Sequence, residues 1–483
     1  MSSPTSRRTS PAPRIIFWTL LALAAVLGAI AVWIRYRFGS ITFEQVLSTL
    51  PVAGGEGVGN EGYAVEFATW CVGIPLGTVA VAALVARRRR RPVRRAALLA
   101  PGTAAAIALG TLLIVAGVPQ YAAASLDSRT VAEYYVPPRV ETRPEQPRNL
   151  ITIYLESTEN TYADAGRFGA NLIAAHQQAT AGWAGYDLRQ DPVGGWTMAG
   201  LVGSQCGIPL KSQLVAGDPS SFTAGESVEH FLPGAICLGD VLRAEGYTNA
   251  FLGGAHLRFA GKGTFLTDHG FTRLRGREEW ELTEDESVMS PWGLSDARLF
   301  EHAEQTLAEL RAEGGPFHLS LLTLDTHEPG AVFPSCEDAS APSPIAAALK
   351  CSGAALAGFL DHLDQAGYLD DTVVVVMGDH LKNLSDSDQL RDQLTGAEER
   401  TIFFRVHSPD PVSFARPGAD QLSVLPTVLE LLGFGLPEGR AGLGVSFAAH
   451  HGLHRTLAAL PKPAYASLLQ APSRDLYHRF WTG

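Results

Sequence analysis

After residue 120 the sequence lacks any apolar run long enough to cross a membrane, although three such runs precede it. The rear of the chain is therefore expected to be a soluble domain and the front a membrane anchor. The front also lacks lysine: residues 1–119 contain 12 Arg and 4 Glu, a formal charge of +8. Because the whole chain carries −11, residues 120–483 carry −19. This basic, apolar front and acidic rear argue against a nucleic-acid-binding protein.

The three apolar runs cover about residues 15–34, 63–86 and 96–118, with Glu66 as a charge inside the second. Each approaches the roughly 20 residues that a helix needs to span a bilayer. A cleaved signal peptide is the alternative for the first run. Its apolar core is longer than the roughly 7–15 residues of such peptides, and two further candidate spans follow. We therefore predict an anchor of three transmembrane helices within residues 1–119.

Arginines predict how this anchor is oriented. Arg87 to Arg91, Arg94 and Arg95 lie between the second and third runs, while Arg7, Arg8 and Arg14 precede the first. Such clusters usually stay in the cytoplasm, although an arginine run can also bind nucleic acid. With a cytoplasmic N-terminus, residues 38–61, including Gly54 to Gly57, form a short external loop. The prediction is a multi-pass protein of a bacterial-type inner or plasma membrane, with an extracytoplasmic domain.

After the third run, residues 120–148 contain four prolines and many charges, which predicts a linker between the anchor and a domain at 149–483. This domain holds the cysteines Cys206, Cys237, Cys336 and Cys351, and Cys71 lies in the second run. An even count in an oxidising compartment predicts two disulfides. Among three connectivities our hypothesis is the local pairing Cys206–Cys237 and Cys336–Cys351. No C-x-x-C pair is present, which disfavours zinc binding by these four.

From residue 149 short apolar runs alternate with amphipathic segments. Strands are predicted at 150–155, 248–252, 317–324, 372–377 and 401–406, and helices at 237–245, 355–366 and 424–432. Strands that are apolar on both faces and alternate with helices indicate an α/β fold with a mostly parallel sheet flanked by helices. In such sheets ligands bind at the carboxyl ends of the strands.

Polar residues follow three of these strands. They are Glu156 with Glu159, then Asp325 with His327, and finally Asp379 with His380. Carboxylates and imidazoles that face one crevice are what a divalent metal site requires. A single Asp-His pair is more often structural, and we expect Asp361-His362, inside a predicted helix, to be solvated. Asp268-His269 is expected to shape a loop rather than to bind metal.

The glycine-rich segment Gly194-Gly-Trp-Thr-Met-Ala-Gly200 carries the strongest chemical signal. Thr197 could begin a helix, where its hydroxyl would lie near the positive end of the helix dipole. A bound metal would lower the pKa of this hydroxyl and make it a nucleophile. The alternative is an ordinary N-cap threonine before a packed helix.

The threonine segment with Ser204-Gln-Cys-Gly-Ile-Pro-Leu210, Glu156 after an apolar strand and the late Gly378-Asp-His380 together resemble the phosphoglycerol transferases. These belong with lipoteichoic acid synthases in the sulfatase-like part of the alkaline phosphatase superfamily. The branch that modifies osmoregulated periplasmic glucans is the most similar, over about residues 148–448. Members of that branch often have four spans, whereas this sequence has three. The segment from Leu422 to Gly433 also resembles a late helix of sulfatase-like enzymes.

The resemblance implies a role for each candidate residue. Glu156, Thr197, Asp379 and His380 would hold one divalent cation, with manganese favoured and magnesium or zinc as alternatives, and Thr197 would also be the nucleophile. Lys262 would replace an arginine that contacts the phosphate, keeping its charge but losing bidentate contact. His327 would bind the phosphate or protonate the leaving group. The family tryptophan near this lysine is absent, and Phe259 is the nearest aromatic residue in the sequence.

The implied reaction is phosphodiester transfer, which needs a nucleophile, charge neutralisation and an acid for the leaving group. Thr197 would attack phosphatidylglycerol, release diacylglycerol and become phosphoglycerol-threonine. A hydroxyl of a glycan or of a glycerol-phosphate chain would then take the group.

Four other functions compete with this one. A sulfatase would need Cys/Ser-x-Pro-x-Arg, which does not surround Thr197. Phosphoethanolamine transferases use a similar threonine, but the neighbouring residues favour the phosphoglycerol branch. A polymerising lipoteichoic acid synthase and a non-catalytic binding or sensing module stay open.

Overall fold

The computed structural model describes residues 12–39, 41–43, 46, 65–88, 95–126, 128–213, 228–290, 292–336, 341–385 and 388–483. Its described residues up to 122, together with Ser385, form one compact unit, and the other described residues from 123 onward form a second. The two units are described separately below. Arg7, Arg8, the loop at Gly54 to Gly57 and the arginine cluster at 89–94 lie outside the described residues.

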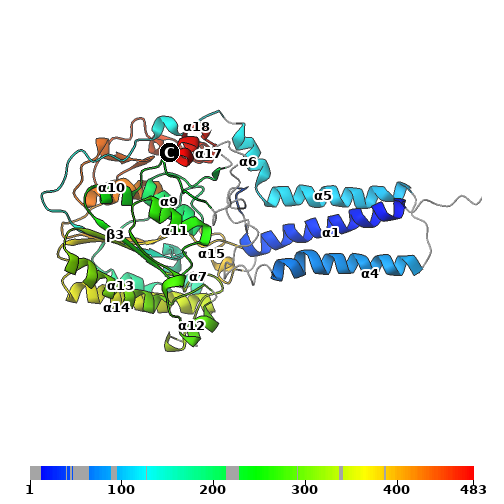
Figure 1. Ribbon diagram of the computed structural model, residues 1–483, viewed down its shortest axis with the longest axis horizontal. Coiled ribbons are helices and arrows are strands. Elements are labelled where there is room, and N and C mark those ends of the chain that lie inside the picture. The colour runs from blue at the N-terminus through cyan, green and yellow to red at the C-terminus, as the bar shows by residue number, and fades with distance from the viewer. Residues whose placement is uncertain are drawn as a thin grey trace, which may run out of the picture. The chain divides into compact units, whose positions relative to one another are not determined.

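The first unit contains three helices long and apolar enough to cross a membrane, as the sequence predicts (Figure 1). They span Ala12–Phe38 (α1), Val65–Arg88, which ends in α4 (Ile74–Arg88), and Ala96–Val115, which includes α5 (Leu99–Val115). Helix α1 packs against both α4 and α5, and α6 (Val118–Ser125) follows. Large apolar side chains such as Val32 (70% exposed) and Leu99 (74% exposed) face outward. Such surface is expected to face hydrocarbon.

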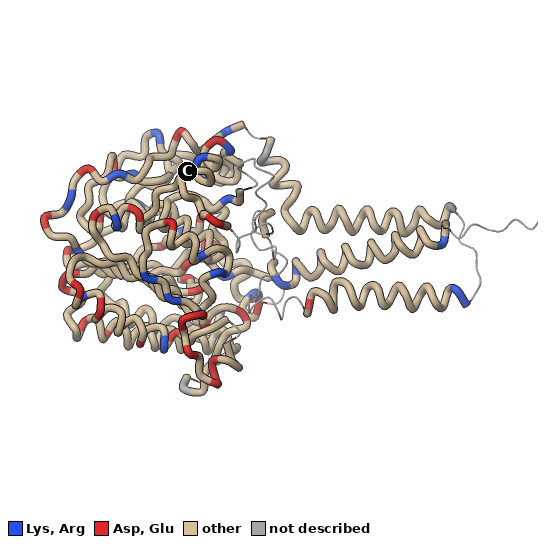
Figure 2. Tube along the Cα trace, viewed as in Figure 1, with Lys and Arg blue, Asp and Glu red and all other residues tan. Residues whose placement is uncertain are grey.

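The charge inside the second helix has a partner within this unit. Glu66 accepts hydrogen bonds from Trp33 Nε1 (3.0 Å) and Arg37 Nε (2.9 Å), both near the end of α1. Pairing removes much of the cost of placing an ionised carboxylate next to a membrane span. Figure 2 shows charged residues near the ends of these helices, whereas in the second unit they are scattered over many elements.

The described part of the second unit is built on a seven-stranded sheet with the order β2-β7-β6-β1-β5-β3-β4. Strands β1 (Asn149–Leu155), β3 (Thr248–Gly253), β4 (Arg273–Arg275), β5 (Phe317–Leu322) and β6 (Thr372–Gly378) are parallel. Strand β7 (Phe404–His407) pairs antiparallel with β6, and β2 (Ala184–Gly185) pairs antiparallel with β7 at the edge of the sheet. The predicted mostly parallel α/β sheet is confirmed.

Helices cover both faces of this sheet (Figure 1). Alternate side chains of β1 point to opposite faces: Leu150 and Tyr154 belong to one apolar core, and Ile151 and Ile153 to the other. The first core includes residues of α9 (Thr197–Cys206), α10 (Leu238–Ala244), α11 (Lys262–Asp268) and α16 (Val424–Leu431). The second includes residues of α13 (Asp296–Glu313) and α14 (Pro344–Gln365).

Smaller helices complete this unit. They are α7 (Ala165–Phe168), α8 (Ala174–Ala179), α12 (Glu284–Met289), α15 (Arg391–Leu394), α17 (Lys462–Gln470) and α18 (Arg474–Thr482). Helix α13 has no counterpart among the predicted elements. Helix α14 begins at Pro344 instead of 355, because the Ser343 hydroxyl caps its first turn by accepting from Ala346 N (3.3 Å).

Residues before β1 also pack on the second unit. Val131 is fully buried in its first core, and the backbone at Val136 and Thr142 bridges to Gly442 and Gly435. The described residues contain disulfides between Cys206 and Cys237 and between Cys336 and Cys351. Cys71, in the first unit, is free and buried.

Candidate metal and phosphate site

Two neighbouring parallel strands bring three candidate ligands together. Glu156 directly follows β1, and Asp379 and His380 directly follow β6, whose Gly378 is paired with Leu155. One ligand atom from each of the three lies within 4.8 Å of the others, and all three residues are buried. The sheet register therefore brings residues that are more than 220 positions apart in the sequence into one cluster; Ser157, next to Glu156, is 222 positions from Asp379.

The ring of His380 is oriented toward the two carboxylates. Its Nδ1 lies 2.8 Å from the Leu381 carbonyl oxygen, which can only accept, so Nδ1 carries the proton. Nε2 then faces Glu156 Oε1 at 3.7 Å and Asp379 Oδ2 at 3.5 Å. Burial lowers the pKa of His380, but the charges of Asp379 and Glu156 outweigh it and raise that pKa above its ordinary value. A cation at this site would replace the proton on Nε2, and the proton on Nδ1 already suits a metal-binding imidazole.

Asp379 offers one oxygen to the cluster. Its Oδ1 accepts hydrogen bonds from the backbone nitrogens of Ser157 and His380, both at 2.8 Å. Its Oδ2 is buried and has no hydrogen-bond partner among the described residues. A buried carboxylate oxygen without a donor is costly unless a cation meets it. Asp379 therefore fits a metal ligand that is already fixed in orientation.

The electrostatics of the two carboxylates support the same conclusion. Burial opposes ionisation of Glu156, but His380, His327 and Lys382 outweigh it and lower its pKa to about 2. Burial and the Glu156 carboxylate raise the pKa of Asp379 to about 7. Two carboxylates this close repel each other, and a divalent cation between them would remove the repulsion. Carboxylate oxygens and an imidazole nitrogen are suitable ligands for manganese, magnesium or zinc.

Thr197 lies next to this cluster. It is the first residue of α9, and its Oγ1 donates to Glu156 Oε2 at 3.3 Å. Trp196 holds the N-cap position, with an extended backbone, and in the described structure no side chain caps this helix. Thr197 is therefore not an N-cap threonine, and its hydroxyl is directed to the carboxylate cluster near the positive end of the helix dipole.

Lys262 supplies a buried cation to the same region. It begins α11, is 2% exposed, and its Nζ lies 5.9 Å from the centre of the Phe251 ring. Within the described ranges no hydrogen bond or ion pair to its ammonium is found. Burial lowers its pKa to about 8, and the charges of Glu278 and Glu156 oppose this effect. A buried ammonium without a partner is a suitable contact for an anion such as phosphate.

His327 follows β5 and lies against aromatic side chains. Its ring centre is 4.2 Å from that of Trp292, which is 6.0 Å from that of Phe259. Trp292 Nε1 donates to the Glu328 carbonyl oxygen at 3.2 Å, which fixes the indole. Burial lowers the pKa of His327 below its ordinary value, although the charge of Glu156 opposes this. The sequence alone gave no reason to place Trp292 at this site.

Lys382 was also missed. Its Nζ lies 3.1 Å from Glu328 Oε1, and its backbone nitrogen donates to Glu159 Oε2 at 3.1 Å. Glu159 is fully buried and forms an ion pair with Arg400, whose Nε donates at 2.9 Å. The Glu159–Arg400 ion pair fixes the segment after His380. In the sequence, only the position of Glu159 in the polar run after β1 pointed to this pair.

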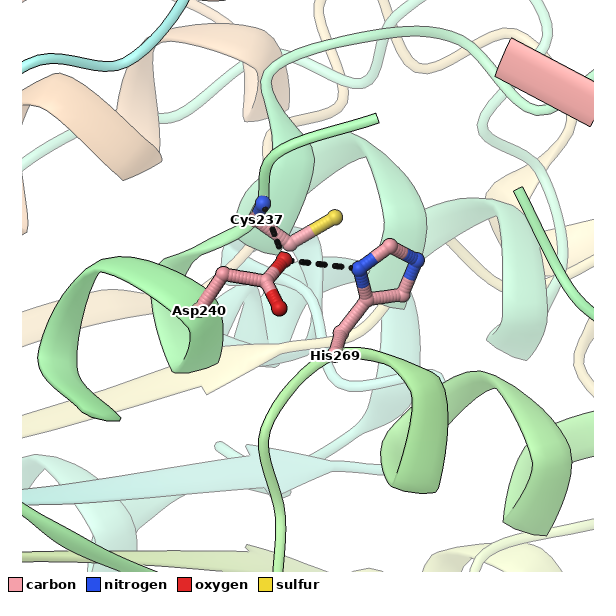
Figure 3. A group of neighbouring side chains, drawn as sticks. All are labelled: Cys237, Asp240 and His269. Carbon is pink, nitrogen blue, oxygen red and sulfur yellow. Dashed lines mark hydrogen bonds and ion pairs between the residues drawn. The ribbon is translucent and has the colours of Figure 1, made fainter. Parts of the chain in front are cut away.

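A second group with metal-ligand atoms, Cys237, Asp240 and His269, is shown in Figure 3. Cys237 is bonded to Cys206, so its sulfur is unavailable as a thiolate ligand. Asp240 Oδ2 accepts from Cys237 N (2.8 Å) and lies 2.8 Å from His269 Nδ1, while His269 Nε2 faces the Phe231 carbonyl at 3.0 Å. Both ring nitrogens are occupied, so this group ties α10 to the end of α11.

The remaining Asp-His pairs have structural contacts. Asp268 Oδ2 accepts from Phe231 N at 2.7 Å, at the end of α11. His362 lies on the outer surface of α14, 3.8 Å from Glu304.

A family model and two curated relatives match this chain. Residues 199–434 match the family model described as Sulfatase. The chain is 34% identical over 375 residues to phosphoglycerol transferase I of Xanthomonas campestris pv. campestris (strain B100), covering 73% of this chain and 49% of that protein. It is 35% identical over 287 residues to phosphoglycerol transferase I of Escherichia coli O139:H28 (strain E24377A / ETEC), covering 58% and 36%. The chain thus spans half or less of the length of these curated relatives.

Among solved structures, a protein in the alkaline phosphatase superfamily from Vibrio parahaemolyticus superposes with a TM-score of 0.51 and 18% identity, covering 70% of this chain and 79% of that chain. This likeness concerns the fold. The predicted resemblance to phosphoglycerol transferases and the sulfatase-like fold of the second unit are both confirmed.

Proposed function

We propose that this protein is a metal-dependent phosphoglycerol transferase that moves glycerol phosphate from phosphatidylglycerol to a hydroxyl of a glycan or glycerol-phosphate acceptor. The relatives named phosphoglycerol transferase I support the reaction class. One observation carries the proposal: the Thr197 hydroxyl donates to Glu156 inside a cluster completed by Asp379 and His380. A hydroxyl beside buried carboxylates fits an activated nucleophile, whereas a binding module has no need of it.

Glu156, Asp379, His380 and Thr197 would hold the cation, with manganese favoured over magnesium and zinc. When bound, such a cation supplies Lewis acidity that lowers the pKa of the threonine hydroxyl and neutralises phosphate charge. Lys262 binds a phosphate oxygen with its ammonium. Thr197 Oγ1 gives up its proton to solvent and attacks phosphorus, the bond to the diacylglycerol oxygen breaks, and a phosphoglycerol-threonine forms. An acceptor hydroxyl then attacks the same phosphorus, the bond to Thr197 Oγ1 breaks, and that oxygen regains a proton from solvent.

His327 handles protons in both halves of this reaction. Its Nδ1 lies 3.1 Å from the Glu328 carbonyl oxygen, so Nδ1 is protonated and Nε2 is the exchanging atom. Nε2 gives a proton to the diacylglycerol oxygen and later takes one from the acceptor hydroxyl. The lowered pKa of this partly buried histidine favours the second role near neutral pH.

The anchor would bring the domain to its lipid donor. We place the N-terminus in the cytoplasm and the second unit outside, on the basis of the arginines that precede α1 and follow α4. Arg37, at the opposite end of α1, is an apparent exception. Its ion pair with Glu66 offsets its charge, so it does not argue against this orientation.

The test is to incubate the full-length protein with manganese and phosphatidylglycerol labelled in the head group, without acceptor. We expect label on Thr197 in peptide mass spectrometry, together with released diacylglycerol, and neither product from Thr197→Ala. Label on Thr197 from phosphatidylethanolamine alone would overturn the proposal in favour of a phosphoethanolamine transferase. Absence of label from every donor would favour a binding module. Adding an acceptor then separates single transfers from polymerisation by product length.

A further inference from the structure

Gln421 connects the segment before Thr197 to a candidate metal ligand. It lies in the short 3-10 helix Gln421–Ser423, directly before α16, and is 0% exposed. Its Oε1 accepts from the backbone nitrogen of Asp191 at 3.0 Å, and its Nε2 donates to the Asp379 carbonyl oxygen at 2.6 Å. One amide therefore fixes the loop that leads into α9 and the backbone of Asp379.

Two glycines of the threonine segment make this arrangement possible. A Cβ on Gly194 would lie 2.4 Å from Gln421 Oε1, and a Cβ on Gly200 would lie 2.1 Å from the Asp379 carbonyl oxygen. Real side chains do not approach this closely, so both positions exclude a Cβ unless the backbone moves. These glycines, on either side of Thr197, thus allow α9 to lie directly against Asp379 and Gln421.

The orientation of Asp379 is therefore fixed at two places, its carboxylate and its backbone carbonyl. Backbone nitrogens hold its carboxylate through Oδ1, while Gln421 holds its carbonyl oxygen. Loss of the Gln421 donor would leave a buried carbonyl oxygen without this hydrogen bond, which is costly if nothing moves. Movement of Asp379 relieves that cost and displaces Oδ2 from Glu156 and His380.

We infer that Gln421 is a positioning residue that fixes Thr197 relative to Asp379 and His380, and thereby sets the affinity for the cation that these residues would hold. This inference rests on the proposed function. Gln421 acts through Asp379 and through the loop at Asp191, and it does not touch the reacting atoms. Groups that orient metal ligands in this way typically contribute about 10- to 100-fold to metal affinity.

The discriminating substitution is Gln421→Glu. Glutamate keeps the size and the acceptor for Asp191 N, but it turns a second acceptor oxygen toward the Asp379 carbonyl. Asn249→Asp is a matched control in β3. Asn249 is also fully buried, and its Nδ2 donates to the carbonyl oxygens of Gly239 (2.8 Å) and Gly270 (2.9 Å). Both variants therefore place a carboxylate against buried carbonyl oxygens. Asn249→Asp does so away from Glu156, Asp379 and His380.

The experiment measures manganese affinity by calorimetry and transfer as a function of manganese concentration, with the full-length protein. We expect Gln421→Glu to raise the manganese dissociation constant at least about tenfold, with part of the transfer restored at saturating manganese. Asn249→Asp should lower the thermal midpoint but change that dissociation constant less than about twofold. Gln421→Met, which buries no charge, gives the same test if the glutamate variant does not fold.

Wild-type manganese affinity in a folded Gln421→Glu or Gln421→Met variant would overturn this inference. An equal loss of affinity in Asn249→Asp would do the same, because the effect would then be general destabilisation. A wild-type protein that binds no divalent cation would instead reject the proposed function, so the two failures are distinguishable.

Discussion

The Thr197 hydroxyl lies 3.3 Å from Glu156 Oε2 although the two residues are 41 positions apart and come from different elements. One begins a helix and the other follows a strand, so the nucleophile and the carboxylate are held by two rigid parts of the second unit. A contact of this kind is pre-organised, because no loop has to fold before the hydroxyl reaches the cluster.

The alkaline limb of the pH profile should report Lys262. Burial lowers its pKa to about 8, so the ammonium that binds phosphate is lost as the pH rises through 8. We expect kcat/KM for phosphatidylglycerol to fall about tenfold per pH unit above this value. In Lys262→Arg the side chain stays charged and this limb should move upward by more than one unit. An unchanged limb in that variant would show that another group titrates.

Above about pH 8 the loss of the Lys262 proton should raise the stability of the protein, whereas it lowers the transfer activity. The pKa of Lys262 in the folded protein is below the ordinary value of 10.5, so between about pH 8 and 10.5 the unfolded chain holds a proton that the folded protein has lost. The unfolding free energy therefore rises with pH in this window. Comparing the pH dependence of the thermal midpoint of wild type with that of Lys262→Met tests this sign, because the methionine variant should lack the rise.

Removal of the Arg400 guanidinium should destabilise the protein strongly. Glu159 is fully buried, and breaking its ion pair leaves a carboxylate with little compensation. We expect Arg400→Met to cost about 3–5 kcal/mol, seen as a lower thermal midpoint. The double variant Glu159→Gln/Arg400→Met should be more stable than Arg400→Met alone. A double variant that is the less stable of the two would contradict the pairing.

Trp292 should matter for transfer more than for folding. Its ring lies against His327 and forms an edge-to-face pair with Phe259. We expect Trp292→Ala to lower kcat/KM on the order of tenfold, since aromatic contacts contribute about 0.5–1.5 kcal/mol, and Trp292→Phe to lose less. Val288→Ala is the control, because Val288 is 78% exposed on nearby α12. Equal losses in Trp292→Ala and Val288→Ala would reject a specific role of the indole.

The two disulfides should contribute unequally to stability. The Cys206–Cys237 bond closes 31 residues and Cys336–Cys351 closes 15, which chain entropy converts to about 4 and about 3 kcal/mol. The first bond also joins the end of the Thr197 helix to α10. We expect Cys206→Ser/Cys237→Ser to lower both the thermal midpoint and the transfer rate, and Cys336→Ser/Cys351→Ser mainly the midpoint. The reverse order of the two midpoints would contradict this prediction.

The sequence by itself determined the local features of this protein. Hydropathy placed three apolar helices, and the alternation of apolar strands with helices determined the α/β class, because both patterns arise within a few consecutive residues. It also singled out Glu156, Asp379 and His380, since polar residues directly after buried strands are visible in the chain.

Tertiary structure decided which of these side chains meet and which others join them. The register that pairs Leu155 with Gly378 brings Glu156 to Asp379, and sheet pairing over such a separation leaves no local signal. Trp292 has no motif around it, and Gln421 lies just before the recognised segment at Leu422 without any sign of its partners; the positions of both depend on packing between elements 36 or more residues apart. Local periodicity reports burial, whereas a contact between distant segments depends on how the whole chain packs, so these partners became visible only in the folded protein.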